Sequence, residues 1–73
     1  MTDRDETRRR IGLRIAEIRA ARKISQTQLA GLTGIKQGNI SRIELGRYSV
    51  GLDTLETIAR ALGCTVDFVE AGE

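Results

Sequence analysis

The sequence predicts an all-α fold, a compact bundle of four to five short helices in one domain of 73 residues. Three observations predict it. No proline interrupts the chain, aromatic residues make up only 3% of it, and most apolar residues recur at helical spacing. Because 40% of the residues are hydrophobic and only 3% aromatic, we expect a core of Ile, Leu, Val and Ala between closely packed helices.

The first helix is expected to run from about Thr7, a candidate N-cap, to about Arg22. Its inward face should be formed by three residues at i, i+4 and i+7, namely Ile11, Ile15 and Ile18. Gly12 costs helix stability, so we expect another helix to approach closely there. Residues 1–6 show no periodicity and are expected to be a flexible N-terminus, the domain to span 7–70, and 71–73 to be a tail.

A second helix should begin after Ser25, because Ser25 and Gln28 have the spacing of a capping box. Leu29 and Leu32 give this helix an apolar stripe. Gly34 is the residue type that most easily adopts the left-handed conformation of a helix end. The segment therefore predicts a helix of about two turns.

A third short helix, over residues 36–45, follows at once. Ile40 and Ile43 lie on neighbouring turns of it, and Gly46 supplies a second stop. Ala30 is small enough for the two helices to approach at a steep angle, and Gly34 permits the tight turn between them. Two short helices around such a turn predict a helix-turn-helix.

This segment resembles the helix-turn-helix of the lambda-repressor-like (XRE-type) regulators. The matching residues are Ile24, Ser25, Gln26, Leu29, Ala30, Gly34, Ile35, Gln37, Ile40, Ser41, Arg42, Ile43, Glu44 and Gly46. The resemblance extends over residues 11 to about 70. It implies an ion pair between Arg19 and Glu44, and it implies that Gln26 touches a phosphate and packs against Gln37.

In a major groove, the outward residues of the third helix would meet the bases. With Ile40 and Ile43 inward, Gly38, Ser41 and Arg42 fall on the opposite side and Gln37 on the flank. Glutamine can bond adenine and arginine guanine, although Arg42 could instead hold a phosphate. The remaining candidates are Asn39 for a base or the backbone, Gly38 for close approach, and Lys36 and Arg47 for phosphates.

Charge is distributed unevenly along the chain. Residues 1–48 carry 11 Lys/Arg against 5 Asp/Glu, while residues 49–73 carry one arginine against 5 acids. The overall charge of +2 conceals this division. Because the positive half contains the motif, the charge pattern favours a DNA-facing surface there.

A fourth helix should open at Gly51 or Asp53 and end at Gly63. Its apolar face is expected to comprise Leu52, Leu55, Ile58, Ala59 and Leu62. The segment 65–70 fits either a short fifth helix or a strand that pairs with its copy in a dimer. We expect a homodimer whose interface includes Val66, Phe68 and Val69.

An enzyme is not expected. The chain has no His, no nucleophile elbow and no phosphate-binding glycine loop, and its size leaves no room for a pocket of about 300 Å³. With one Cys, no disulfide within the chain, metal site or cofactor is expected. The absence of a signal-peptide core and of a long apolar run favours a cytoplasmic protein without a membrane partner.

The expected function is therefore sequence-specific binding of double-stranded DNA by a repressor-like regulator, a dimer reading a palindromic operator with helix 36–45. Two alternatives stay open. The chain could be an antitoxin that binds a toxin and regulates its own operon, or a protein-interaction module of the same fold. The sequence does not reveal the operator or any effector.

Overall fold

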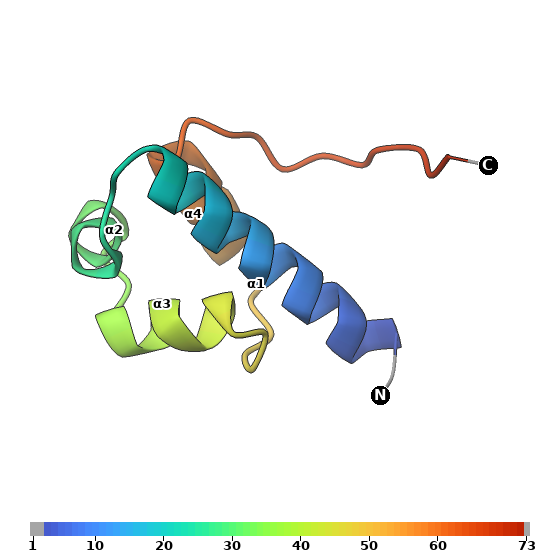
Figure 1. Cartoon of the computed structure of the whole chain (residues 1–73), viewed down its shortest axis with the longest axis horizontal. Coiled ribbons are helices and arrows are strands. Elements are labelled where there is room, and N and C mark those ends of the chain that lie inside the picture. The colour runs from blue at the N-terminus through green and yellow to red at the C-terminus, as the bar shows by residue number, and fades with distance from the viewer. Residues whose placement is uncertain (1–2, 73) are drawn as a thin grey trace.

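Four helices form the part of the chain that the computed structural model describes, residues 3–72. They are α1 (Asp3–Ala21), α2 (Gln26–Thr33), α3 (Gln37–Glu44) and α4 (Leu52–Ala61). Figure 1 shows α1 as the long diagonal helix, with α3 crossing below it and α2 at one end. Within residues 3–72 there is no strand, and no helix is long and apolar enough to cross a membrane. The all-α prediction is confirmed, and the described residues 3–72 form four helices without a fifth.

The helix ends follow from local sequence signals. The Ser25 side chain accepts from the Gln28 N–H at 3.0 Å, and the Gln28 side chain accepts from the Ser25 N–H at 2.7 Å. This is the predicted capping box. Gly34 ends α2 at a φ of 75°, and Gly46 follows α3 at 73°, so both predicted stops are confirmed. The α4 helix begins after Gly51.

The predicted start of the first helix near Thr7 was wrong, because α1 begins at Asp3. Asp5 and Glu6 lie near the N-terminus of α1, where the positive end of the helix dipole stabilises negative charges. Asp5 also pairs with Arg8 one turn later. These contacts stabilise a turn that projects past the core, where apolar periodicity gives no signal. Residues 3–6 of the expected flexible N-terminus are helical, and residues 1–2 lie outside the described residues.

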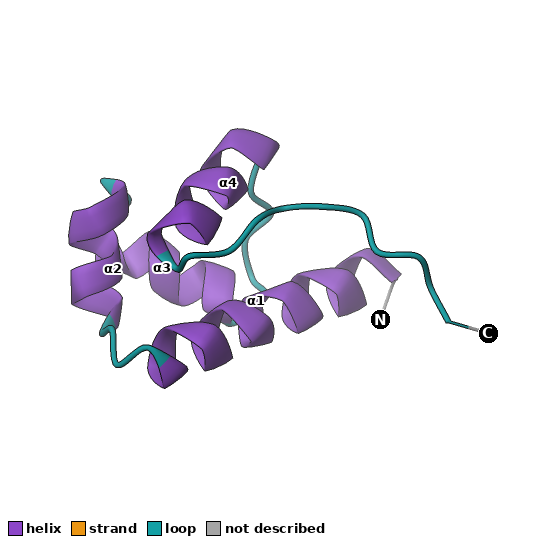
Figure 2. Ribbon diagram, turned by 90° about the horizontal axis from the view of Figure 1, so that it is seen from above, coloured by secondary structure: helices purple, strands orange, loops and turns teal. Residues whose placement is uncertain are grey.

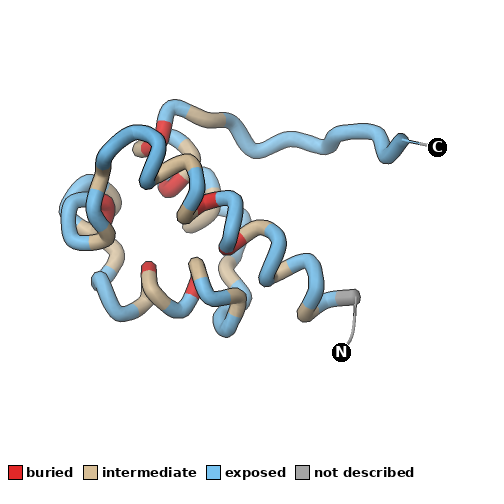
Figure 3. The backbone as a smooth tube through the Cα atoms, viewed as in Figure 1, coloured by how far each residue is buried: buried red, intermediate tan, exposed pale blue. Residues whose placement is uncertain are grey.

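The core lies where the four helices meet (Figure 3). Its buried side chains are Ile15, Leu29, Ile40, Ile43, Ile58 and Leu62. Ile11 and Ile18 pack against them as predicted. Leu32 and Leu52, however, are 64% and 69% exposed, contrary to their assignment to inward faces. Leu32 is rotated about 60° from Leu29 on a short helix, and Leu52 is the first residue of α4, so neither reaches the core.

Gly12 is buried where α1 meets the C-terminal end of α3. A Cβ atom at Gly12 would lie 2.7 Å from the carbonyl oxygen of Glu44 and closer still to that of Ile43. No rotamer change relieves such a contact, because the opposing atoms are backbone. The predicted close approach of a second helix is therefore confirmed.

Residues 64–72 follow α4 without regular structure (Figures 1 and 2). The helix considered for residues 65–70 does not form here. Val66, Phe68 and Val69 are 40%, 102% and 90% exposed, so nothing in this single chain buries the face that would stabilise one. Pairing as a strand requires a second copy and stays a prediction.

Candidate nucleic-acid interface

The α3 helix presents a polar face because its apolar face is buried. Ile40 and Ile43 are 1% and 4% exposed. On the outward side, Gln37, Gly38 and Arg42 are exposed. The other candidates from the sequence are arranged around them, with Asn39 and Ser41 half-buried and Lys36 and Arg47 exposed at the two ends of the helix.

An ion pair fixes the far end of α3 to α1. Arg19 Nε and Nη2 donate to the two carboxylate oxygens of Glu44, at 2.6 and 2.9 Å. The side chains are only 17% and 5% exposed. The hydrogen bond to Glu44 raises the pKa of Arg19 above its ordinary value, although partial burial opposes it. The structure therefore contains the pair that the resemblance implied, and it holds the guanidinium charged.

The same carboxylate connects α3 to α2. Glu44 Oε1 accepts from Gln26 Nε2 at 2.9 Å, and Gln26 Oε1 accepts from Gln37 Nε2 at 2.8 Å. Arg19, Glu44, Gln26 and Gln37 thus form one hydrogen-bonded chain across three helices. Since a glutamine amide carries two N–H donors and a carbonyl oxygen, Gln37 keeps one N–H and its oxygen for another partner. The contact between Gln26 and Gln37 is present, while the link from Gln26 to Glu44 was not anticipated.

Arg42 lies one turn after Asn39 on the outward side of α3. Its Nη1 donates to Asn39 Oδ1 at 3.2 Å, which directs the guanidinium toward the start of the helix. Arginine has five donors in a planar fork, so this single bond leaves the fork available for a base or a phosphate.

Tyr48 and Thr54 were not singled out in the sequence. They line a hollow of about 330 Å³ together with Lys36 and Asn39, beside the start of α3. Tyr48 is 47% exposed, and it belongs to a loop in which no periodicity marks a residue as important. An exposed tyrosine directly after Arg47 is the only signal that could have suggested it.

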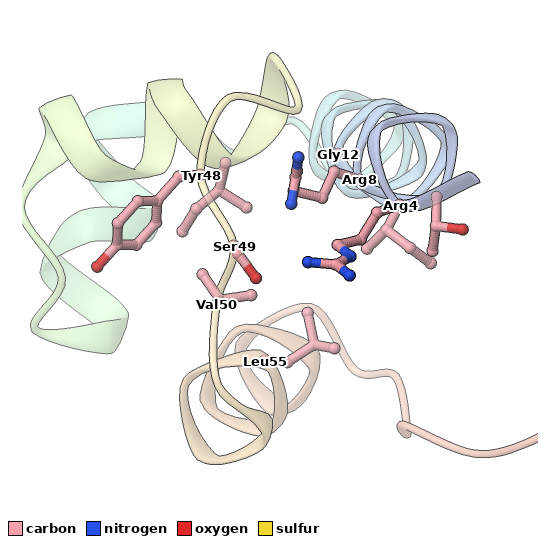
Figure 4. A pocket seen from close by; sticks show the side chains of 10 residues that line it. Arg4, Arg8, Gly12, Tyr48, Ser49, Val50 and Leu55 are labelled. Atoms are coloured by element: carbon pink, nitrogen blue, oxygen red, sulfur yellow. The ribbon is translucent and has the colours of Figure 1, made fainter. Parts of the chain in front are cut away.

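A larger hollow corrects the expectation that the chain has no room for a pocket. It measures about 510 Å³ and lies between the first half of α1, the loop after α3, and α4. Figure 4 shows Arg4 and Arg8 converging on it from α1, with Ser49 and Val50 opposite and Leu55 from α4. None of the DNA-contacting residues predicted from the sequence lines it, although Tyr48 lines both this hollow and the smaller one beside the start of α3.

A short helix held by a glycine turn, with its polar side outward and basic residues at both ends, is the arrangement of a helix-turn-helix. The model of the Helix-turn-helix family matches residues 15–69. The chain therefore belongs to the lambda-repressor-like (XRE-type) helix-turn-helix family of DNA-binding transcriptional regulators.

Two named relatives are similar to this chain over most of its length. An immunity repressor protein of Bacillus phage phi105 is 40% identical over 63 residues, which cover 86% of this chain and 44% of the repressor. A putative antitoxin, HigA2 of Mycobacterium tuberculosis, is 40% identical over 65 residues, covering 88% of this chain and 61% of the antitoxin. This chain therefore spans less than two thirds of either protein.

The crystal structure of the restriction-modification controller protein C.AhdI from Aeromonas hydrophila has a TM-score of 0.81 with this chain at 30% identity. The match covers 86% of this chain and 91% of the controller protein. The fold is thus shared over nearly the whole of both chains.

Proposed function

We propose that this protein is a sequence-specific regulator that binds double-stranded DNA by placing α3 in the major groove. One observation supports this most directly. Gln37 and Arg42 lie outward on a helix whose other side is anchored by Ile40 and Ile43. The hydrogen-bonded chain from Arg19 through Glu44 and Gln26 then orients Gln37 before DNA arrives.

Base recognition is assigned to Gln37 and Arg42. Gln37 can donate its remaining N–H to adenine N7 and accept from adenine N6, while Arg42 can donate to guanine O6 and N7. Each such pair is worth about 1 to 3 kcal/mol of discrimination. Asn39 accepts from Arg42 and can steer it toward one base. Gly38 lets the backbone approach, and Ser41 can bond a base or a phosphate.

Phosphate contacts are assigned to Lys36, Arg47 and Gln26. Lys36 precedes α3 and makes no side-chain capping bond there, so its ammonium can reach the DNA backbone. Arg47 follows α3 at its other end. Because each phosphate contact releases counterions, affinity should fall by about 0.9 log units per contact for each log unit of salt.

The regulator is proposed to be a homodimer that acts as a repressor on a palindromic operator. A single helix reads only a few base pairs, so two half-sites about one helical turn apart are needed for useful specificity. Val66, Phe68 and Val69 are proposed to contribute to the dimer interface. The match to an immunity repressor supports the repressor role. The cytoplasm, where bacterial DNA lies, is the proposed location, and no catalytic role or cofactor is proposed.

The antitoxin alternative has one observation in its favour, the 40% identity with putative antitoxin HigA2. An antitoxin would also bind its own operator, so DNA binding does not separate the two functions. Formation of a stable complex with a toxin encoded next to it would distinguish the antitoxin from the repressor. A module that has lost DNA binding is disfavoured by the exposed Lys36, Arg42 and Arg47.

Selection of tight binders from a random duplex library tests the proposal. We expect a palindromic consensus with two half-sites about one turn apart. Lys36→Ala should then weaken binding to all duplexes about equally and reduce the salt slope by about 0.9. Arg60→Ala, at an exposed position of α4, is the matched control and should change neither. No enriched sequence, or a slope that Lys36→Ala leaves unchanged, would contradict the assignment.

A further inference from the structure

A continuous apolar groove runs along α1 on the side away from the outward face of α3. The hollow of about 510 Å³ adjoins a second of about 190 Å³, because Ile11 and Leu55 line both. The second hollow continues over Ile15, Ile18 and Ile58. The groove is open to solvent along the whole of this line.

Three arginines lie on the rim of this groove, and one of them, Arg8, is paired with Asp5. Arg4 and Arg8 line its wide end, where Figure 4 shows both side chains, and Arg14 lines the narrow end. Arg14 is 69% exposed and meets Glu17 only at 3.5 Å. The groove therefore suits a ligand that has an apolar side chain flanked by negative charges.

The chain itself contains such a segment. Phe68 and Val69 are 102% and 90% exposed, and they are flanked by Asp67 and Glu70, with no basic residue after Arg60. An aromatic side chain left fully in water between two acids is unusual for a folded protein. Its apolar part and its charge both complement the groove.

We propose that residues 68–70 dock into the wide end of the α1 groove of a second copy of this chain, with Phe68 as the anchor. This docking requires the homodimer of the proposed function but does not require DNA binding. The α1 groove is the surface that receives the C-terminal segment. Two-fold exchange buries both copies of Phe68, because each groove receives the other chain's segment. Phe68 and Val69 are thus buried at the wide end, and Glu70 meets Arg4 there.

The segment's own path favours a second copy over its own chain. Cys64, Thr65, Val66 and Asp67 already line the narrow end of the groove. The segment then runs out beyond the helices instead of turning into the wide end (Figures 1 and 2). Neither hollow includes any DNA-contacting residue predicted from the sequence, so docking leaves those side chains free for DNA.

A single tryptophan can report the docking, because the chain contains none. In Phe68→Trp, we expect emission to shift to shorter wavelength, and quenching by acrylamide to fall severalfold, as concentration rises from nanomolar to high micromolar. The midpoint should coincide with the change from monomer to dimer in sedimentation. Leu32→Trp, at an exposed position of α2, is the control and should not change. Burial that is independent of concentration, or no burial at all, would overturn the proposal.

Disulfide trapping locates the docking site. In a Cys64→Ser background, Ser49→Cys chains mixed with Phe68→Cys chains should give a covalent heterodimer under mild oxidation, since Ser49 lines the wide end of the groove. Leu32→Cys replaces Ser49→Cys in the control and should give little product. Equal yields from the two pairs would overturn the proposed site.

The variant Phe68→Ser links the docking to dimer stability, and it should raise the dimer dissociation constant about tenfold or more. An unchanged constant would count against the anchor role. The duplex selection tests DNA binding and these assays test the groove, so either result can be negative while the other is positive. Trapping without any enriched duplex would reject the DNA-binding function alone, and enrichment without trapping would reject the groove alone.

Discussion

The α1–α3 contact encloses charged side chains, whereas the segment 64–72 exposes apolar ones. At the contact, the charges of Arg19 and Glu44 are largely enclosed and bonded to each other, and Glu44 also accepts from Gln26. In the segment, Phe68 and Val69 are apolar yet almost fully exposed. The half of the molecule that carries α3 therefore satisfies its side chains within one chain, whereas the C-terminal segment leaves Phe68 and Val69 uncovered there.

The largest expected effect is at the α1–α3 contact. Gly12→Val would force α1 away from the carbonyl oxygens of Ile43 and Glu44, and backbone atoms cannot rotate aside. We expect a loss of about 3 kcal/mol in the free energy of unfolding, measured by urea denaturation. Gly31→Ala, with nothing within 4 Å of the new Cβ, is the control and should stabilise by up to about 1 kcal/mol. A neutral Gly12→Val would contradict the close packing.

Removing the ion pair should be the next most damaging change. Glu44→Gln leaves Arg19 enclosed without its counter-charge, and we expect a loss of about 1.5 to 3 kcal/mol. A double-mutant cycle with Arg19→Gln should show coupling, because the two side chains share two hydrogen bonds. Additive losses would mean that the two residues act independently.

The pKa shift of Arg19 gives the pH dependence of its contribution. Its folded pKa is raised, so the contribution is complete at every pH below the ordinary pKa of arginine and is lost only as pH rises above it. We therefore expect the loss caused by Arg19→Gln to be the same at neutral and at mildly alkaline pH. A loss that shrank across this range, in denaturation at several pH values, would contradict a charged Arg19.

A smaller effect is expected where α1 turns into α2. Lys23 is the one described residue other than glycine with a positive φ, at 59°. Lys23→Gly should remove that strain and stabilise the fold by about 1 kcal/mol, measured by thermal unfolding. The matched control is Arg22→Gly, where no positive φ is present, and it should not stabilise.

Sequence patterns predicted the features that depend on neighbouring residues. Ser25 with Gln28, and the glycines at 34 and 46, act within one helical turn, so their roles could be inferred from spacing alone. Leu32 and Leu52 were misassigned because their burial depends on which helix faces them. The start of α1 at Asp3 was missed because no core contact produces a periodic signal there.

The candidate site also has some features that sequence patterns predicted and others that they did not. The outward position of Gln37 and Arg42 followed from the inward position of Ile40 and Ile43. The link from Gln26 to Glu44, and the hollow lined by Tyr48, required knowledge of how three helices meet. The groove along α1 could not be predicted, since it lies between segments far apart in the sequence.

The smallest expected effect on the fold concerns the C-terminal segment. Deleting residues 66–73 should change the unfolding free energy of the monomer by less than about 0.5 kcal/mol, because Phe68 and Val69 contact little within their own chain. Urea denaturation of a sample dilute enough to be monomeric measures this free energy. A large loss in the monomer would show that the segment stabilises its own chain.

The most direct test of the central claim is the affinity of Arg42→Ala for the selected operator and for operators with each base pair changed in turn. If Arg42 reads a base, Arg42→Ala should lose discrimination of about 1 to 3 kcal/mol at one position of each half-site and keep it elsewhere. A uniform loss at all positions would make Arg42 a phosphate contact. Unchanged affinity for every operator would contradict the placement of α3 in the major groove.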